Sequence, residues 1–236
     1  MESENYKIVK NFISDDEVKL IIDWVDSLNP EDGDPNYHLS EISKTLKGKS
    51  CIIDISNTEL TNYITNFQSV SKVSKQEIPQ IIKTIFKRIS EENNLPLDNI
   101  FIQAVDMKKG GRIKPHYDAS IDGYINYKCN ISVLSEDYKI FIDGSSPVIE
   151  QKDLYCFEAS LYKHWTEEFN SRRVFLSFGF IVPYSVVGRT ENDPRVRLSQ
   201  RISKYFQKLS WYKTKQKLYL FTKVNADLIR QLIHQK

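Results

Sequence analysis

The sequence has little of what marks membrane, secreted or disulfide-stabilised proteins. No apolar run approaches the roughly 20 residues that a transmembrane helix requires. The first ten residues, MESENYKIVK, are polar and contain no apolar signal-peptide region. The three cysteines are odd in number and widely spaced, which fits neither a disulfide framework nor a thiolate zinc site. We therefore expect a soluble, cytoplasmic protein with reduced cysteines and no membrane partner.

What the chain does contain suits a folded domain with an appendage. Its 236 residues are 40% hydrophobic and 12% aromatic, which is too apolar for a disordered chain. The net charge of +2 is unevenly divided. Residues 189–236 hold 12 basic and 3 acidic residues, whereas residues 1–188 hold 21 basic and 28 acidic ones. We expect residues 1–188 to form the domain and residues 189–236 a basic, aromatic-rich C-terminal extension.

Two amphipathic helices are expected in the first hundred residues. The segment 14–17 (SDDE) has the pattern of a capping box, and apolar residues follow it at helical spacing until Pro30. The segment 74–77 (SKQE) repeats this pattern before a series of isoleucines that ends at residues 93–96. Between the helices, residues 30–50 resemble a loop, and a loop this long is typically functional or mobile.

From residue 99 the pattern changes to short strands rich in Ile, Val, Phe and Tyr, separated by glycine-containing turns. The strands are expected at residues 100–107, 126–134, 138–142, 154–157 and 173–182. Helices followed by strands indicate an α+β fold, in which the N-terminal helices pack on one sheet of a sandwich or small barrel. After residue 183 a further helix is expected, with an apolar face made of Leu198, Ile202, Phe206 and Leu209.

Two of the four histidines have neighbours suited to binding a metal. His116 and Asp118 would point to the same face of an extended segment, because side chains alternate along it. His164 follows 46 residues after Asp118, far enough for antiparallel strands to return the chain to that face. Two histidines and one carboxylate that leave three positions open form the facial triad of non-haem Fe(II) oxygenases. The His-x-Asp pair alone also fits a surface histidine beside a turn aspartate. His38 and His234 are interpreted as exposed.

Arg173 follows His164 by nine residues, at the start of the strand RVFLSFGFIV. Alternation places Arg173, Phe175 and Ser177 on one face of that strand and Arg172 on the other. A guanidinium group can hold a carboxylate through two parallel hydrogen bonds. An isolated strand arginine is more often part of a surface ion pair, so the residues around it decide its role.

The order His-x-Asp, β-structure, His and then Arg resembles the Fe(II)- and 2-oxoglutarate-dependent dioxygenase superfamily. The resemblance spans about residues 99–183, and the segments GGRIKPHYD and IVKNFISDDEVKLII resemble its prolyl 4-hydroxylase-like subgroup. It implies a double-stranded β-helix (jelly roll) fold. It also implies that His116, Asp118 and His164 bind Fe(II) as the catalytic centre and that Arg173 binds 2-oxoglutarate. O2 would be the second cosubstrate, with ascorbate as reductant.

Further pocket residues are expected on the strand after the first two ligands. Tyr127 and Asn130, with Tyr124 and Lys128 nearby, would line the cosubstrate or substrate pocket, although a solvated strand face fits them equally well. The chain also departs from the prolyl hydroxylase pattern. Met107 stands where a tyrosine is usual, no Gly-Gly-x-Thr segment follows, and collagen-type members commonly have lysine in place of this arginine. A proline substrate therefore does not follow from the resemblance.

The basic extension bears on the choice of substrate. Residues 195–223 interleave basic and aromatic side chains, as nucleic-acid-binding segments do, but an amphipathic helix packed on the core or an acidic protein partner fits as well. We favour a hydroxylase of a protein or amino-acid side chain, such as proline. One alternative is a nucleic-acid-modifying dioxygenase that uses residues 189–236. Another is a non-enzymatic β-helix protein that only binds a metal or a partner.

Overall fold

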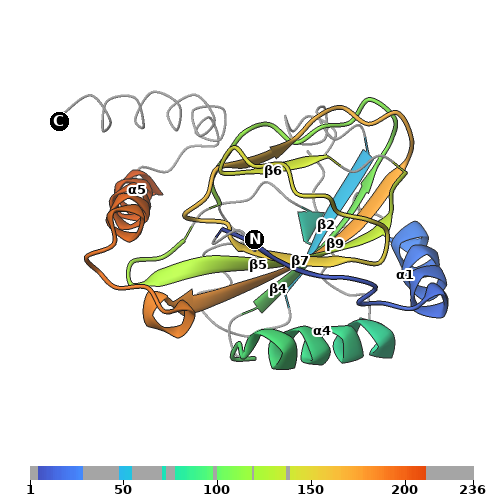
Figure 1. Cartoon of the computed structure of the whole chain (residues 1–236), viewed down its shortest axis with the longest axis horizontal. Helices are drawn as coiled ribbons and strands as arrows, with labels where there is room; N and C mark the ends of the chain where they lie inside the picture. The colour runs from blue at the N-terminus through green and yellow to red at the C-terminus, as the bar shows by residue number, and fades with distance from the viewer. Residues whose placement is uncertain are drawn as a thin grey trace.

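The computed structural model describes residues 5–28, 48–54, 71–72, 78–97, 100–118, 120–136 and 139–210. Two of its long helices lie in the first half of the chain and one lies near the end (Figure 1). The helices are α1 (Asp15–Ser27), α4 (Gln80–Asn93), the short 3-10 helix η3 (Tyr184–Val187) and α5 (Pro194–Ser210). The strands are β1 (Lys7–Val9), β2 (Gly48–Asp54), β3 (Ser71–Lys72), β4 (Ile100–Met107), β5 (Tyr124–Leu134), β6 (Ile140–Ile142), β7 (Leu154–Glu158), β8 (His164–Thr166) and β9 (Arg173–Pro183).

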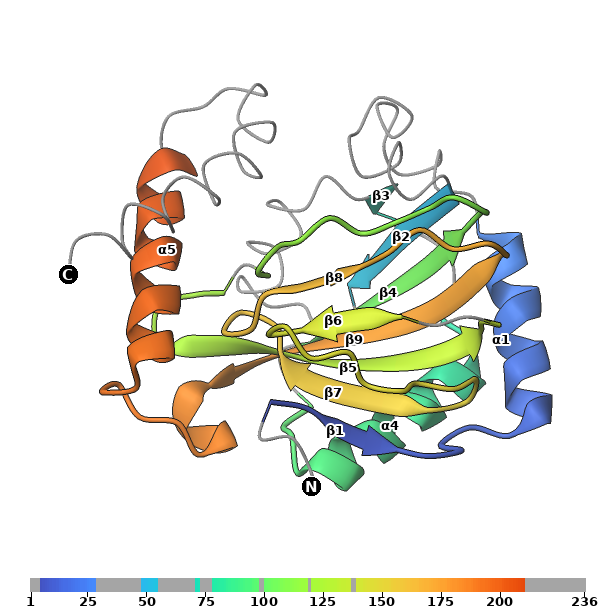
Figure 2. The ribbon, with the colours of Figure 1, turned by 45° about the horizontal axis from the view of Figure 1, so that its top comes forward.

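Seven strands form one large sheet, in the order β1-β7-β5-β9-β4-β2-β3. Its neighbouring strands are antiparallel, apart from β2 and β3, which run parallel. β6 and β8 form a second, antiparallel sheet, and Figure 2 shows it over one face of the large sheet, with α4 beneath the other. Two sheets with helices on the outer face agree with the predicted α+β, jelly-roll-like fold.

The two faces of the large sheet differ chemically, because side chains alternate along each strand. On β9, the even-numbered residues from Val174 to Val182 pack with isoleucines of α1 and α4 in the main hydrophobic core. The odd-numbered residues, beginning with Arg173, therefore point to the side on which β6 and β8 lie. This inner face, enclosed between the two sheets, contains the candidate site.

The first helix confirms the predicted capping box. The Ser14 hydroxyl accepts a hydrogen bond from the backbone N–H of Glu17 at 3.2 Å, and the Glu17 carboxylate accepts one from the backbone N–H of Ser14 at 2.8 Å. The Glu17 carboxylate also pairs with Arg88 of α4 at 3.1 Å. The cap therefore starts α1 and joins it to the neighbouring helix.

The second helix begins later than predicted. α4 starts at Gln80, directly after Pro79, and the predicted start at 74–77 is wrong for this helix. A proline disfavours helical backbone in the residue before it, so Ile78 stays outside the helix. Residues 73–77 themselves lie outside the described part of the chain. The predicted end is confirmed, because Asn94 adopts a left-handed conformation with φ 49° and ψ 47°.

The predicted strands are present as β4, β5, β6, β7 and β9, with bounds shifted by at most two residues. The sequence does not predict β1, β2, β3 or β8. β1, β3 and β8 have only two or three residues, too few to show alternation. β2 contradicts part of the predicted loop at 30–50, because it begins at Gly48 and pairs with β4 along its length. Residues 29–47 lie outside the described residues.

The helix expected after residue 183 is α5, but its buried face differs from the predicted one. Val196, Ser199 and Ser203 are buried, whereas Leu198 and Ile202 are only half-buried. α5 therefore docks through small side chains, with Val196 in contact with a cluster of buried residues from elsewhere in the domain. None of the helices in the described ranges combines the length and the apolar composition that a membrane span requires.

Candidate metal centre

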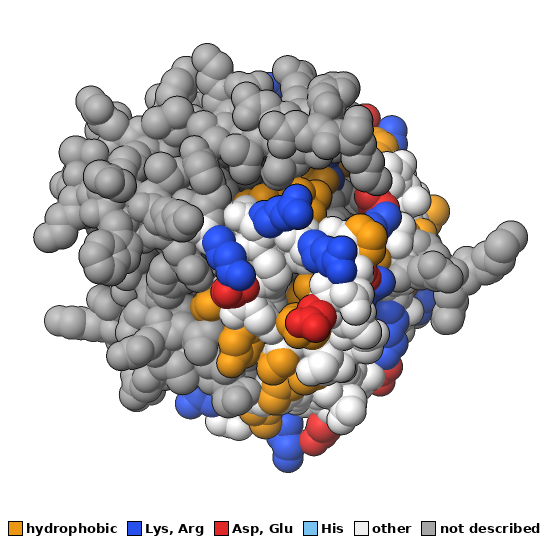
Figure 3. All heavy atoms as spheres, turned by 90° about the vertical axis from the view of Figure 1, so that its left-hand side faces the viewer, with side chains coloured by type: hydrophobic (Ala, Val, Ile, Leu, Met, Phe, Trp, Pro, Cys, Tyr) orange, Lys and Arg blue, Asp and Glu red, His pale blue; other side chains and the backbone are white. Residues whose placement is uncertain are grey.

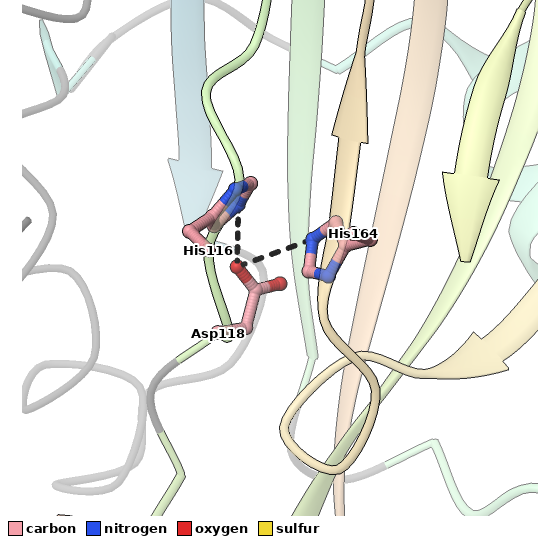
Figure 4. Close-up of side chains that lie close together, drawn as sticks. All are labelled: His116, Asp118 and His164. Atoms are coloured by element: carbon pink, nitrogen blue, oxygen red, sulfur yellow. Dashed lines mark ion pairs between the residues drawn. The ribbon is translucent and has the colours of Figure 1, made fainter. Parts of the chain in front are cut away.

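The backbone brings the three predicted ligands together by pairing two distant segments. His116 lies opposite His164 in an antiparallel bridge, with N–H to carbonyl distances of 3.1 and 2.9 Å in the two directions. The N–H of Asp118 then donates to the carbonyl of Ala159 at 2.9 Å. This pairing places all three side chains on the same side of the two segments, where Figure 4 shows them pointing toward one another.

The side chains form a compact group that could hold a cation. One donor atom from each residue lies within 4.8 Å of the other two. The Asp118 Oδ1 atom lies 3.3 Å from His116 Nε2 and 3.8 Å from His164 Nε2. The two imidazole rings are 4.2 Å apart between centroids and tilted by 52°, so their Nε2 atoms converge without the rings stacking flat.

Both histidines present the same nitrogen to this centre. His116 Nδ1 lies 2.7 Å from the carbonyl oxygen of Lys114, and His164 Nδ1 lies 3.0 Å from the carbonyl oxygen of Tyr162. A carbonyl can only accept, so each Nδ1 carries the hydrogen and donates it. Each Nε2 is left with a free lone pair, which is the arrangement that metal-binding histidines use.

The Asp118 carboxylate is buried, with 9% of the residue exposed, and yet charged. Its Oδ2 atom forms an ion pair with Lys128 Nζ at 2.7 Å. Burial alone would raise the pKa of Asp118, but the Lys128 ammonium is the largest of the causes that together lower it below its usual range. The aspartate is therefore an anionic ligand at neutral pH.

His164 is held in its neutral form. Burial is the largest cause, and the neighbouring His116 and Lys128 add to it, so that the pKa of His164 falls to about 3 despite the opposing effect of Asp118. The ring also meets the edge of Phe157, whose centroid lies 4.9 Å away. At neutral pH this imidazole has no proton to lose before it binds a cation.

These residues fit a divalent iron ion. Two imidazole nitrogens and one carboxylate oxygen are the donor set of the facial triad, and the three atoms lie close enough to bind one ion together. His38 and His234, the other histidines of the sequence, lie outside the described residues.

Arg173 lies on the inner face of β9 and is 1% exposed. Its guanidinium carbon lies 4.6 Å from the ring centroids of both Phe169 and Phe175, so two aromatic side chains shield it from water. Arg172 has a different environment, because it forms ion pairs with Asp26 and Asp106. The predicted difference between the adjacent arginines is therefore present in the structure.

Three polar side chains that sequence reasoning mostly missed share this inner face with Arg173. Asn130 of β5 lies opposite Ser177 of β9, and Ser132 lies opposite Phe175. Asn130 is 5% exposed, and the two serines are fully buried. Among the described residues, Asn130 Oδ1 and both serine hydroxyls have no hydrogen-bond partner. Buried polar groups normally have partners, so these three atoms are candidates to hydrogen-bond a polar ligand. The sequence signal that could have found them is the presence of polar residues at alternate positions of otherwise apolar strands.

Tyr127 has a different location from the other predicted pocket residues. It lies on the outer face of β5, where it packs against the hydrophobic core beneath α1 and α4. Burial, with the nearby Cys156, Cys129 and Glu158, raises its pKa above the usual range. The structure thus brings Arg173, Asn130 and Lys128 to the inner face and places Tyr127 on the other side of the sheet.

No family model and no curated relative matches the sequence. Solved structures similar to this chain include the viral collagen prolyl hydroxylase of Paramecium Bursaria Chlorella virus-1 in a 2OG complex, at 12% identity and a TM-score of 0.49, covering 77% of this chain and 98% of that one. A Pseudomonas putida prolyl-4-hydroxylase is 13% identical with a TM-score of 0.49, and the match covers 75% of this chain and 91% of that one. A truncated form of the viral protein is 13% identical with a TM-score of 0.47, and the match covers 76% of this chain and 90% of that one. Similarity at this level concerns the course of the backbone, and the side chains carry the functional argument.

Proposed function

We propose that the protein is an Fe(II)- and 2-oxoglutarate-dependent dioxygenase that hydroxylates a C–H bond. The observation that carries this proposal is the convergence of His116, Asp118 and His164, one donor atom of each lying within 4.8 Å of the other two. Asp118 Oδ1 lies 3.3 and 3.8 Å from the two Nε2 atoms. Backbone hydrogen bonds at both Nδ1 atoms and the ion pair at Oδ2 leave these three atoms free to bind an ion. A metal-binding protein without activity would not need the buried arginine and polar residues beside the triad.

The residues of the candidate site would have distinct parts in this activity. Bound iron, with 2-oxoglutarate and O2, supplies a reaction that releases succinate and CO2 and inserts one oxygen atom into a substrate C–H bond. His116, Asp118 and His164 would hold the ion, and their preset hydrogen bonds mean that little reorganisation is needed on binding. Phe157 packs against His164 and helps to keep water from this side of the centre.

The cosubstrate would lie along the inner face between the triad and Arg173. The Arg173 guanidinium would bind one carboxylate of 2-oxoglutarate through two hydrogen bonds. Phe169 and Phe175 keep water from that guanidinium, which strengthens its attraction for an anion. Asn130 and Ser177, whose oxygen atoms have no partner among the described residues, are placed to hydrogen-bond the same ligand.

We propose a protein or amino-acid side chain as the substrate, with proline as the first candidate to test. The likeness of the segments around residues 8–22 and 110–118 to prolyl 4-hydroxylases supports this class.

Nucleic acid is the second candidate, and the contacts of α5 argue against it. Among the basic residues of the described tail, Arg189 pairs with Glu158, Arg195 with Asp143 and Lys204 with Asp122. On the face of the described residues shown in Figure 3, basic side chains lie beside acidic ones. Paired cations release fewer counterions on meeting phosphates and so bind them less strongly.

The proposal is tested by incubating the protein with Fe(II), 2-oxoglutarate and separate pools of proline-containing peptides and of oligonucleotides. We expect mass spectrometry to find peptides that have gained one oxygen atom, with an equal amount of succinate. The Asp118→Ala variant and an iron chelator serve as controls that should abolish both products. If the oligonucleotides are oxidised and the peptides are not, nucleic acid replaces protein as the proposed substrate. If succinate formation persists in Asp118→Ala, the proposed dioxygenase activity itself is refuted.

A further inference from the structure

Lys128 is a buried cation that the proposed reaction does not yet use. It lies on the inner face of β5, 7% exposed, with Phe157 of β7 and Gly179 of β9 as its neighbours in register. Glycine has no side chain to occupy the inner face, so the long lysine side chain has room to extend. A lysine is seldom buried unless its charge is matched, and here Asp118 matches it at 2.7 Å.

We propose that Lys128 is a positioning residue, which holds the Asp118 carboxylate so that only Oδ1 is presented to the metal. This inference rests on the proposed metal centre and extends it. The two oxygens of Asp118 have different surroundings: Oδ1 lies 3.3 and 3.8 Å from the two Nε2 atoms, whereas Oδ2 lies against the ammonium.

The backbone of Asp118 cannot supply this orientation alone. Its N–H is bound to the carbonyl of Ala159, which fixes the start of the side chain but leaves the carboxylate plane free to turn. The ion pair between the Lys128 ammonium and Oδ2 is what favours one orientation of that plane. Its cation comes from β5, an 11-residue strand that is paired on both sides, with β7 and β9, so the lysine starts from a rigid element.

The orientation matters because it sets how many coordination positions of the metal ion the carboxylate occupies. A carboxylate that binds an ion through both oxygens occupies one more position than a carboxylate that binds through one. The facial triad works because three positions stay open. By engaging Oδ2, Lys128 would keep the third position available to the cosubstrates.

The test measures metal binding rather than turnover. Co(II) is added without oxygen to the full-length protein, and its visible absorption bands report both affinity and coordination. Lys128→Met keeps the length of the side chain and removes the charge, Lys128→Arg keeps the charge, and Lys108→Met alters an exposed lysine as a control. We expect Lys128→Met to bind Co(II) about 10–100-fold more weakly with an altered spectrum, as loss of a group that orients a ligand typically does. Lys128→Arg should recover most of the affinity, and Lys108→Met should match the wild type.

The outcomes separate this inference from the proposed function. If the wild type binds Co(II) and Lys128→Met binds it equally well with the same spectrum, the positioning role is wrong and the metal centre stands. Equal loss in Lys128→Met and Lys128→Arg would also reject the role, because charge would then not matter. If the wild type binds no Co(II), the centre and the role are both wrong. All proteins must show the wild-type far-UV circular dichroism spectrum, and if Lys128→Met does not fold, Lys128→Gln takes its place.

Discussion

The backbone carbonyls of Lys114 and Tyr162 decide which nitrogen of each histidine is free to bind a metal. At the scale of single residues, the centre depends on individual contacts of this kind, each of which fixes how one side chain presents its atoms. In the same way, the ion pair with Lys128 at Oδ2 leaves Oδ1 of Asp118 to face the centre. Two phenylalanines hold the Arg173 guanidinium in an apolar environment. A ligand that enters this site finds its partners already oriented, which reduces the entropy lost on binding.

The role of Arg173 can be separated from that of the metal ligands. Arg173→Lys keeps the positive charge but loses the two parallel hydrogen bonds. Because a hydrogen bond to a charged group contributes about 1.5–3 kcal/mol, we expect the 2-oxoglutarate concentration needed for half-maximal succinate formation to rise about 10–100-fold. Co(II) affinity should not change. Arg172→Lys, at a residue paired with Asp26 and Asp106, is the matched control and should leave both values unchanged. Loss of metal binding in Arg173→Lys would contradict the assignment.

The Ser177 hydroxyl should reduce stability in the absence of a ligand. It is fully buried and has no partner among the described residues. Ser177→Ala should therefore leave the free energy of unfolding unchanged or raise it by up to about 1 kcal/mol, while weakening 2-oxoglutarate binding. Ser90→Ala is the control, because the buried Ser90 hydroxyl donates to the carbonyl of Leu95 at 2.5 Å and its loss should cost about 1 kcal/mol. Urea unfolding measures both, and a clear loss of stability in Ser177→Ala would show that its hydroxyl has a structural role.

At the scale of elements, the helix ends show what local sequence can decide. The capping box at Ser14 is present with both hydrogen bonds, whereas the similar pattern at 74–77 does not start α4. The difference is Pro79, whose effect on the residue before it outweighs the capping pattern. The short strands β1 and β8 depend on partners far along the chain, and no local pattern predicts them.

The cap of α1 gives a stability prediction. Ser14→Ala removes the acceptor for the Glu17 N–H and should lower the free energy of unfolding by about 1 kcal/mol. The urea midpoint should fall while the slope of the transition stays constant. Ser146→Ala, at an exposed serine, should change stability by less than about 0.5 kcal/mol. Equal effects of the two substitutions would show that the cap does not stabilise the helix.

At the scale of the whole molecule, the uneven charge helps to hold the start of the C-terminal segment against the domain. Arg189 pairs with Glu158 at 2.8 Å and with Asp193 at 3.1 Å, and it donates to the Tyr162 hydroxyl at 2.6 Å. Arg195 and Lys204 then pair with Asp143 and Asp122. The part of the basic segment that the structure describes thus uses much of its charge within the molecule.

Breaking this attachment should loosen α5. Arg189→Met removes three partners of a half-buried arginine, so the backbone amides of residues 196–204 should exchange with solvent about tenfold faster. Arg197→Met is the control, because Arg197 is exposed and, among the described residues, its side chain forms hydrogen bonds only within its own segment, with Asn192 and Glu191. Hydrogen exchange followed by mass spectrometry measures both. Unchanged exchange in Arg189→Met would mean that the apolar contacts of Val196 suffice to hold the helix.

The sequence predicts the triad and Arg173 because their chemistry depends on residue type and on alternation along strands. The sequence does not separate Tyr127 from Asn130, because which face of β5 is enclosed depends on where the helices and the small sheet pack. Lys128 and Ser177 become informative only once β5, β7 and β9 are in register. The same holds for the buried face of α5, whose small side chains do not stand out in the apolar pattern.

The central claim is that His116, Asp118 and His164 together hold the iron that consumes 2-oxoglutarate. The most direct test is to measure succinate released from 2-oxoglutarate with Fe(II), O2 and the peptide pool, in the wild type, His164→Ala and Asp122→Ala. We predict iron-dependent succinate formation in the wild type and in Asp122→Ala, an aspartate that pairs only with Lys204 of α5 among the described residues. His164→Ala should reduce it about a hundredfold or more, since the metal contributes several kcal/mol to the reaction. Succinate formation at the wild-type rate in His164→Ala would contradict the account.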